Sequence, residues 1–288
     1  MPATSAGMTR WQEQEQRMKL RSTGFLTIGS SELEYRMIGP QPEDAPTIVM
    51  LHEGLGSAAL WGDFPDRLQA ATGAGVFVHS RAGYGVSSPV TLPRPIDYMQ
   101  IEALEVLPKL LDAIGFRRGI LVGHSDGGSI AAVYAGGIAD HRVRAIALLA
   151  PHFIVEDICV ASIAEIKTTY ETTDLRAKLA RWHKDVDNAF YGWNGAWLDP
   201  EFRAFDISDY LAYIRVPVAI IQGAEDQYGT LRQIEIAQQE CYCPVEVTVL
   251  PEVGHSPHRE AAAATLTVLR DFYSAIMDMH EQPAGRAA

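Results

Sequence analysis

A serine flanked by glycines is the residue best suited to chemistry in this chain. The run Gly123-His124-Ser125-Asp126-Gly127 has the G-x-S-x-G spacing of a nucleophile turn. An apolar run, 119–122, precedes it, and a stretch rich in small residues, 128–132, follows. A sharp strand-to-helix turn would present the Ser125 hydroxyl above the strand end and aim helix N–H groups at it. The alternative is a glycine turn whose serine is satisfied locally.

A serine hydroxyl needs a base to take its proton, and His255 is the best-placed candidate. It follows the last expected strand, 245–250, and precedes the final helical stretch, so its loop can reach back over the sheet. His258 is the second choice, with a surface or capping role expected for it. His124 is expected to point to the opposite side of the turn and to act as a packing residue.

Asp226 is the predicted carboxylate that orients this base. It lies in the run Gly223-Ala224-Glu225-Asp226, shortly after the apolar run 218–221. Glu225 is the alternative, but the first acidic residue of such a turn usually faces outward. The three candidate residues then follow the chain order serine, aspartate, histidine.

An oxyanion hole would need two main-chain N–H groups close to the serine. The first is predicted at Asp126, directly after the nucleophile. The second is predicted at Gly54, with Leu55 as the next choice, in the loop that follows the apolar run 47–51. His52 is expected to brace this loop by hydrogen bonding.

The elements that would position these residues alternate along the chain. Residues 25–28 and 33–38 alternate in polarity around a Gly-Ser-Ser turn, which predicts an antiparallel hairpin. Short continuous apolar runs are typical of parallel strands buried on both faces; they lie at 47–51, 75–78, 119–122, 145–149 and 218–221. The chain is expected to return to the sheet at 245–250. Helical spacing separates them, as at 101–114 and 260–279. The pattern predicts a mostly parallel, doubly wound α/β sheet.

One interval is too long for a simple crossover, because about 65 residues separate the strand ending near Ala150 from the one starting near Pro217, against the usual ~15. Helices are predicted around 160–170 and 174–185. We expect a helical cap over the strand ends. The predicted units are a polar arm over residues 1–20, a core over 21–151 and 206–288, and a cap over 152–205.

The predicted cap is rich in large aromatic side chains. They are Trp182, Phe190, Tyr191, Trp193 and Trp197, and His183 lies among them. Such a set can form a small core that holds the cap to the main unit, and it can also line an apolar pocket. Both roles can hold at once. The pocket residues we predict are Glu53, Leu55, Trp182, Tyr191, Trp193 and Trp197.

Composition limits the partners. A formal charge of −12 argues against nucleic acid, which needs clustered Lys and Arg. The cysteines, Cys159, Cys241 and Cys243, form neither an even disulfide framework nor a zinc-site spacing, so no metal is expected. With no apolar segment of membrane length, a cytoplasmic protein without membrane contact is expected. We expect a small-molecule substrate and no cofactor, and a homodimer is possible.

Taken together, four motifs make the chain over about residues 24–280 resemble the α/β-hydrolase superfamily. Within it, the chain is similar to the capped serine hydrolases that include bacterial esterases, enol-lactonases and meta-cleavage-product hydrolases. The motifs are His52-Glu53-Gly54, Arg81-Ala82-Gly83-Tyr84-Gly85-Val86-Ser87, the Ser125 turn, and Gly223 to Asp226 with Gly254-His255. The order serine, acid, histidine is that of this fold. Haloalkane dehalogenases and epoxide hydrolases resemble the same fold, but they carry aspartate where this chain has Ser125.

Two residues depart from the family pattern. Glu53 stands where relatives usually have glycine. A structural pair with Arg81 is favoured over selection of a polar substrate, because an unpaired buried carboxylate is costly. Asp126 follows the nucleophile, where its side chain would repel a substrate carboxylate held close by.

The resulting prediction is a serine hydrolase that cleaves a carboxylic ester of a small, partly apolar acid. Ser125 attacks, His255 takes the proton, Asp226 orients the imidazole, and the N–H groups of Gly54 and Asp126 stabilise the oxyanion. The alternatives are a lactonase, an enol-lactonase or a C–C bond hydrolase with the same residues. A cofactor-free oxygenase would also keep this set, and a non-catalytic receptor on the fold is the alternative from another class.

Overall fold

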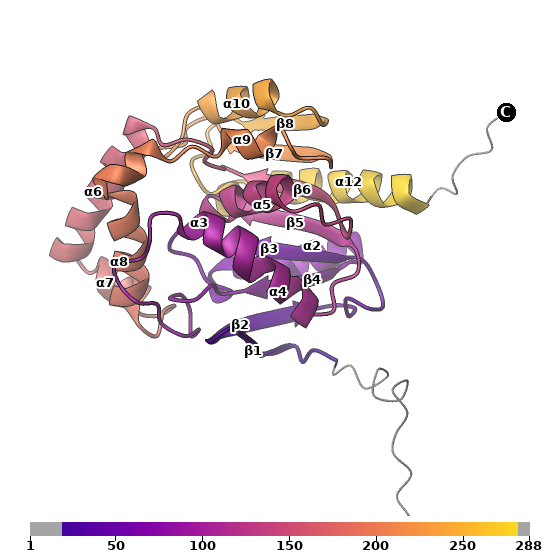
Figure 1. The fold of residues 1–288 in the computed structure, drawn as a ribbon, viewed down its shortest axis with the longest axis horizontal. Helices are drawn as coiled ribbons and strands as arrows, with labels where there is room; N and C mark the ends of the chain where they lie inside the picture. The colour runs from indigo at the N-terminus through magenta and orange to yellow at the C-terminus, as the bar shows by residue number, and fades with distance from the viewer. Residues whose placement is uncertain (1–18, 282–288) are drawn as a thin grey trace, which may run out of the picture.

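The computed structural model describes residues 19–281, which contain a sheet of eight strands. Figure 1 shows this sheet at the centre of the protein, with helices around it. The strand order is β1-β2-β4-β3-β5-β6-β7-β8; β1 and β4 each pair antiparallel with β2, and all other pairs are parallel. The strands are β1 (Thr23–Ile28), β2 (Ser31–Ile38), β3 (Thr47–Leu51), β4 (Gly75–His79), β5 (Gly119–His124), β6 (Val143–Leu149), β7 (Val218–Gly223) and β8 (Val245–Leu250). The predicted fold class, including the N-terminal hairpin, is confirmed.

The central strands are buried on both faces. Every residue of β3, β4, β5 and β7 is buried, as the continuous apolar runs predicted for parallel strands. Because strands β3 to β8 run parallel, their carboxyl ends meet at one edge of the sheet. The loops that carry the candidate residues all leave the sheet at this edge.

Strand β3 shows how the sheet separates two hydrophobic clusters. Val49 and Leu51 belong to one cluster, whereas Ile48 and Met50 belong to the other. Successive side chains of a strand point to opposite faces, so this alternation places one cluster on each side of the sheet. Helices α2 (Phe64–Thr72) and α12 (Ala262–Glu281) supply Phe64, Leu68, Leu269 and Phe272 to the second cluster.

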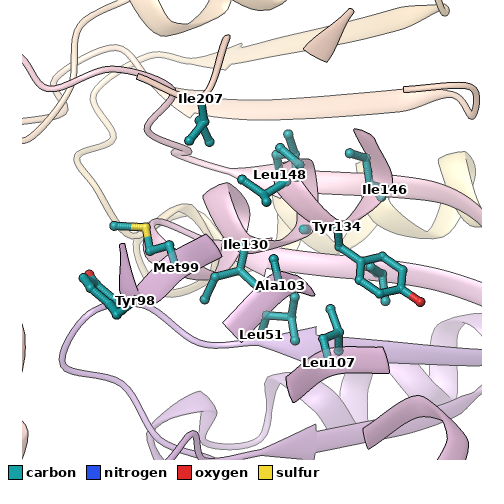
Figure 2. Packing of buried hydrophobic residues seen from close by; sticks show 14 of the residues in the cluster. Leu51, Tyr98, Met99, Ala103, Leu107, Ile130, Tyr134, Ile146, Leu148 and Ile207 are labelled. Atoms are coloured by element: carbon teal, nitrogen blue, oxygen red, sulfur yellow. The ribbon is translucent and has the colours of Figure 1, made fainter. Parts of the chain in front are cut away.

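Figure 2 shows part of the first cluster, which is built by the helices on the opposite face. Helix α5 (Asp126–Gly137) contributes Ile130 and Tyr134. Helices α3 (Tyr98–Ile101) and α4 (Leu107–Ala113) add Met99 and Leu107. This packing fixes α5, and therefore the turn at its start, against the sheet.

The helix expected around 101–114 is present but is interrupted. A π-helical segment, Glu102–Val106, joins α3 to α4. Pro108 lies in the first turn of α4, where it has no N–H to donate and its ring crowds the preceding turn. The wider π-helical turn accommodates this crowding.

The segment between β6 and β7 holds five helices, α6 (Asp157–Thr172), α7 (Leu175–Leu179), α8 (Val186–Trp197), η3 (Pro200–Ala204) and α9 (Ser208–Leu211). Figure 1 shows α6, α7 and α8 gathered beside one end of the sheet. The helix expected over 160–170 is therefore longer, and the one expected over 174–185 shrinks to α7. Helix α8 contains the aromatic run, for which no helix was predicted. The Asp185 side chain caps it by accepting a hydrogen bond from the Asn188 N–H.

Only the last two residues of the predicted polar arm, 1–20, fall within the described residues. No helix of residues 19–281 is long and apolar enough to cross a membrane.

Candidate active site

Ser125 occupies the turn between β5 and α5 in a strained backbone conformation. Its φ is 52° and its ψ is −118°, a region that a non-glycine residue rarely adopts. The flanking glycines make the turn possible. A Cβ at Gly123 would collide with the Gly127 carbonyl, and one at Gly127 would collide with the Leu51 carbonyl. The side chain of Ser125 is therefore presented on a cavity at the carboxyl edge of the sheet.

His255 and Asp226 are brought together across two neighbouring loops. His255 Nδ1 lies 2.9 and 2.8 Å from the two Asp226 carboxylate oxygens. Asp226 also accepts hydrogen bonds from the Gln222 amide and the Tyr228 N–H, both at 2.7 Å. Burial alone would raise the pKa of Asp226, but the hydrogen bond and charge of His255 outweigh it and lower that pKa. An ionised Asp226 holds the proton on Nδ1 and leaves Nε2 of a neutral His255 free to accept one.

The loop that carries His255 is held on both sides. The Glu260 carboxylate accepts hydrogen bonds from the Gly254 N–H at 2.7 Å and the Ser256 N–H at 2.9 Å. His124 Nε2 lies 2.7 Å from the His255 carbonyl oxygen. The position of the imidazole is thus set by backbone contacts as well as by Asp226.

Two histidines differ from expectation. His124 does not point away from the candidate base, because its ring centroid lies 5.1 Å from that of His255. It is a packing residue, but it packs on the His255 loop. His258 is not at the surface: it is buried in α11 (Pro257–Glu260), with its ring 4.6 Å from Trp61. Its ring packs against Trp61 and Phe64, and neither ring nitrogen has a hydrogen-bond partner.

The loop after β3, predicted to supply the second oxyanion donor, is braced by His52 and Arg81. His52 Nδ1 lies 2.7 Å from the Glu53 carbonyl oxygen, and its Nε2 accepts a hydrogen bond from the Arg81 N–H at 3.1 Å. The Arg81 guanidinium donates to the carbonyl oxygens of His52 and Glu53. Burial lowers the pKa of His52 well below its usual value, so its ring is neutral.

Arg81 therefore contacts the Glu53 backbone and not the Glu53 carboxylate, and the expected pair is wrong. The carboxylate lies 3.1 Å from Arg259 Nη2 and 3.4 Å from His124 Nδ1. Arg81 is occupied by the two carbonyl groups and lies 3.9 Å from the Asp126 carboxylate.

Asp126 turns its side chain into the protein. Its carboxylate accepts a hydrogen bond from the Tyr98 hydroxyl, which in turn accepts one from the Trp197 indole at 3.0 Å. Burial raises the pKa of Asp126, while the nearby Arg81 charge opposes the rise. Because Arg81 and Tyr98 compensate this carboxylate, the repulsion expected toward a substrate carboxylate is weakened.

A cavity of about 230 Å³ lies between the strand-end loops and helices α6 and α8. Its walls include Ser125, His255, Gly54 and Asp126, and of the predicted pocket residues Glu53, Leu55, Trp193 and Trp197. Asp226 is not on the wall but lies behind His255. Trp182 and Tyr191 do not line this cavity; both are on the outside, with 42% and 38% of their surfaces exposed.

The sequence reasoning missed several wall residues, among them His152, Cys159, Ile163 and Tyr228. His152 comes shortly after the end of β6, and its ring centroid lies 5.4 Å from that of His255. Its place beyond the carboxyl end of a buried strand is the signal that could have identified it. Cys159 and Ile163 lie on α6, where the sequence carries no comparable signal.

No group of three or more His, Cys, Asp or Glu side chains within residues 19–281 is arranged to hold a metal ion.

Comparison with solved structures finds the same fold in an enol-lactonase from Burkholderia xenovorans LB400. The TM-score is 0.68 at 19% identity, with 87% of this chain and 100% of that chain covered. A serine hydrolase involved in carbazole degradation gives 0.68 at 17% identity, covering 88% and 98%. A hydrolase from Pseudomonas aeruginosa PA01 gives 0.67 at 19% identity, covering 87% and 97%.

A search of the curated proteins finds no match. The model of the alpha/beta hydrolase family, in contrast, matches residues 48–268, a span that runs from β3 into α12 and includes all of the candidate residues. The chain therefore belongs to the alpha/beta hydrolase family.

Proposed function

We propose that this protein is a serine hydrolase that cleaves a carboxylic ester of a small, partly apolar acid. The observation that carries the proposal is the hydrogen bond from His255 to the buried Asp226 beside a serine held in a strained turn on the same cavity. Ser125 attacks the ester carbonyl while His255 Nε2 takes its proton. Ionised Asp226 keeps the other nitrogen protonated and stabilises the imidazolium that forms.

The negative charge that develops on the carbonyl oxygen is stabilised by the N–H groups of Asp126 and Gly54. The protonated His255 then gives its proton to the leaving alcohol, which yields an acyl-serine. In the second half, His255 activates a water molecule that attacks this ester and releases the acid. The proton taken from water returns to Ser125 as the acyl bond breaks.

The cavity supports a small substrate. Its volume of about 230 Å³ is below the usual range of sites for drug-sized ligands. The wall opposite the strand ends is apolar, with Ile163, Trp193 and Trp197. We include in the proposal that residues 152–205 act as a cap, which limits the size of the acyl group and excludes water.

A lactone is an internal ester, so a lactonase or enol-lactonase would use the same residues and a small cavity equally well. A C–C hydrolase would use them on a vinylogous ketone. These are alternatives of substrate, and the wall residues do not separate them.

A substrate panel tests the proposal. We expect hydrolysis of p-nitrophenyl esters with short acyl chains, with rates that fall as the chain lengthens. Lactones and ring-cleavage products in the same panel distinguish the alternatives. Ser125→Ala should abolish turnover while preserving the fold by circular dichroism. No turnover of any member by the wild type would favour a non-catalytic receptor, and unchanged activity in Ser125→Ala would contradict the mechanism.

A further inference from the structure

A second carboxylate–imidazole contact lies beside the first and plays no part in the mechanism above. It joins Glu53, next to the Gly54 donor, to His124, next to Ser125. Glu53 Oε2 lies 3.4 Å from His124 Nδ1, an ion-pair distance at which Nδ1 makes no hydrogen bond, and only 1% of the His124 side chain is exposed. On its other side, His124 Nε2 lies 2.7 Å from the His255 carbonyl oxygen. The contact therefore links the oxyanion loop, the nucleophile strand and the loop of the base.

The two contacts of His124 constrain its protonation. A carbonyl oxygen can only accept a hydrogen bond, so Nε2 must carry a hydrogen. In a neutral ring, Nδ1 would then present a lone pair to the Glu53 carboxylate, which is also an acceptor. Two acceptors facing each other beside the buried His124 ring repel. A hydrogen on Nδ1, directed at Glu53, would replace this repulsion by attraction.

The surrounding charges are compatible with such a proton. Arg259 Nη2, on α11, lies 3.1 Å from Glu53 Oε1 and also donates to the Leu60 carbonyl oxygen at 3.0 Å. It stabilises the carboxylate. The other titratable groups facing His124 are His255, on the strand-end loop, and His258 on α11, with ring centroids 5.1 and 4.8 Å away. His152 lies beyond His255.

The His258 ring is kept neutral. Burial lowers its pKa well below the usual value for histidine. The pKa of Glu53 is also lowered, because its contacts with His124 and Arg259 outweigh the effect of burial. A negatively charged Glu53 is thus the counterion nearest to the buried His124.

We propose that Glu53 and His124 are positioning residues, which hold one proton between them and fix the His255 backbone relative to the oxyanion loop. This inference rests on the proposed function of Ser125 and His255. His124 holds the His255 carbonyl, and Glu260 holds the N–H groups of the residues on either side of His255. The loop therefore cannot carry the imidazole away from Ser125 without breaking these contacts. Glu53 also fixes the position of the base relative to the Gly54 N–H group.

The first test replaces the carboxylate by its neutral isostere. Glu53→Gln removes the negative charge that favours a protonated His124. Losing this contact should let the His255 loop shift, and a shift of the base by a fraction of an ångström lowers the rate of reaction. We expect kcat for a short p-nitrophenyl ester to fall about ten- to a hundredfold, with KM little changed. The pH profile of kcat/KM should also move. Asp140→Asn is the matched control, since Asp140 pairs with Arg142 near the start of β6, at the far edge of the sheet.

Substitutions of His124 separate its hydrogen bond from its volume. His124→Phe keeps the ring but loses the donor to the His255 carbonyl, whereas His124→Gln can still donate. We expect the phenylalanine variant to lose more activity than the glutamine variant. Thermal unfolding of each variant identifies any that fails to fold, and Glu53→Gln then carries the test because it alters no buried ring.

A spectroscopic readout tests the proton without relying on catalysis. In ¹⁵N spectra of the imidazole side chains at pH 8, both nitrogens of His124 should carry hydrogen in the wild type and in Asp140→Asn. In Glu53→Gln, Nδ1 should be bare. If the wild type hydrolyses no ester, the proposed function fails, but this spectrum still shows whether Glu53 and His124 share a proton. A neutral His124 in the wild type, or unchanged kcat and pH profile in folded Glu53→Gln, would overturn the proposal.

Discussion

The two walls of the cavity are built on different principles. At the sheet edge, Ser125 follows the buried strand β5 and His255 follows the outer strand β8, and hydrogen bonds to the backbone hold the His255 loop. On the opposite wall, Ile163, Trp193 and Trp197 project from helices α6 and α8 and belong to a hydrophobic cluster. The first wall carries groups that could make and break bonds, and the second determines the shape of the cavity.

Polar contacts also join the helical segment between β6 and β7 to the rest of the protein. His183 accepts a hydrogen bond from the Gly85 N–H at 3.0 Å, and its other nitrogen lies 3.1 Å from the Leu55 carbonyl oxygen. Asn188 bonds both main-chain groups of Val90, at 3.0 and 2.7 Å. The difference implies that changes at the sheet edge alter the rate of reaction, whereas changes on the helices alter the choice of substrate.

The largest effect is expected at the sheet edge, from Asp226→Asn. The amide keeps the size of the side chain but favours the wrong tautomer of His255, so kcat should fall about 10⁴-fold. Steady-state kinetics with a short ester measures this loss. Glu225→Gln, an exposed neighbour, is the control, and equal losses in the two variants would contradict the assignment of Asp226.

A smaller but still large effect is expected where the two walls touch. A Cβ at Gly54 would collide with the indole nitrogen of Trp193, so Gly54→Ala must displace either the oxyanion loop or the indole. Loss of one oxyanion donor costs about 10²-fold in kcat. If the double variant Gly54→Ala with Trp193→Phe regains activity, the indole is what the methyl group displaces. Undiminished kcat in Gly54→Ala would contradict the position of the donor.

On the helical wall, we expect a change of preference instead of a loss of rate. Trp193→Phe should enlarge the cavity and shift the ratio of kcat/KM values toward a longer acyl chain by about tenfold, the scale set by one or two methylene groups. Trp182→Phe is the matched control, because Trp182 belongs to the same segment but lies outside the cavity. A uniform fall for all chain lengths would show that Trp193 acts on the chemistry.

The smallest effect concerns acid stability, which should depend on the sheet and its strand ends. Burial, followed by the charge of Arg81, lowers the pKa of His79 at the end of β4 to about 3. Unfolded histidine binds a proton below about pH 6.5, so stability is greatest above that pH and falls as the pH drops toward 3. One such histidine adds a slope of about 1.4 kcal/mol per pH unit.

Urea unfolding between pH 6.5 and 5 measures this slope. His79→Gln should reduce it, and His141→Gln, at an exposed histidine, serves as the control. An equal slope in the wild type and His79→Gln would show that His79 does not stay neutral in the folded protein.

Sequence and structure agree best at the sheet edge, for a physical reason. Most of the parallel strands are short apolar runs, and the residues after a strand reach the same edge whenever the strands are parallel. Gly123 and Gly127 further mark the turn, because a Cβ at either position would collide with a backbone carbonyl. Position along the chain therefore predicted which loops would meet around Ser125 without knowledge of any side-chain contact.

The helical wall was predicted less well because its geometry depends on rotation about helix axes. Trp193 and Trp197 are one turn apart on α8 and face inward, whereas Tyr191 on the same helix is partly exposed. The aromatic run alone does not distinguish these faces unless it is recognised as a helix. The partner of Glu53 was missed for a similar reason, since Arg259 lies 206 positions away in the sequence and nothing local indicates the contact.

The most direct test of the central claim is covalent labelling of Ser125. A fluorophosphonate reacts with an activated serine hydroxyl and remains attached, and peptide mass spectrometry locates the adduct. We predict a single adduct, on the peptide that contains Ser125. The rate of labelling should fall strongly in Asp226→Asn, and no adduct should form in Ser125→Ala. Labelling at another residue, or none in a preparation that hydrolyses esters, would contradict Ser125 as the nucleophile.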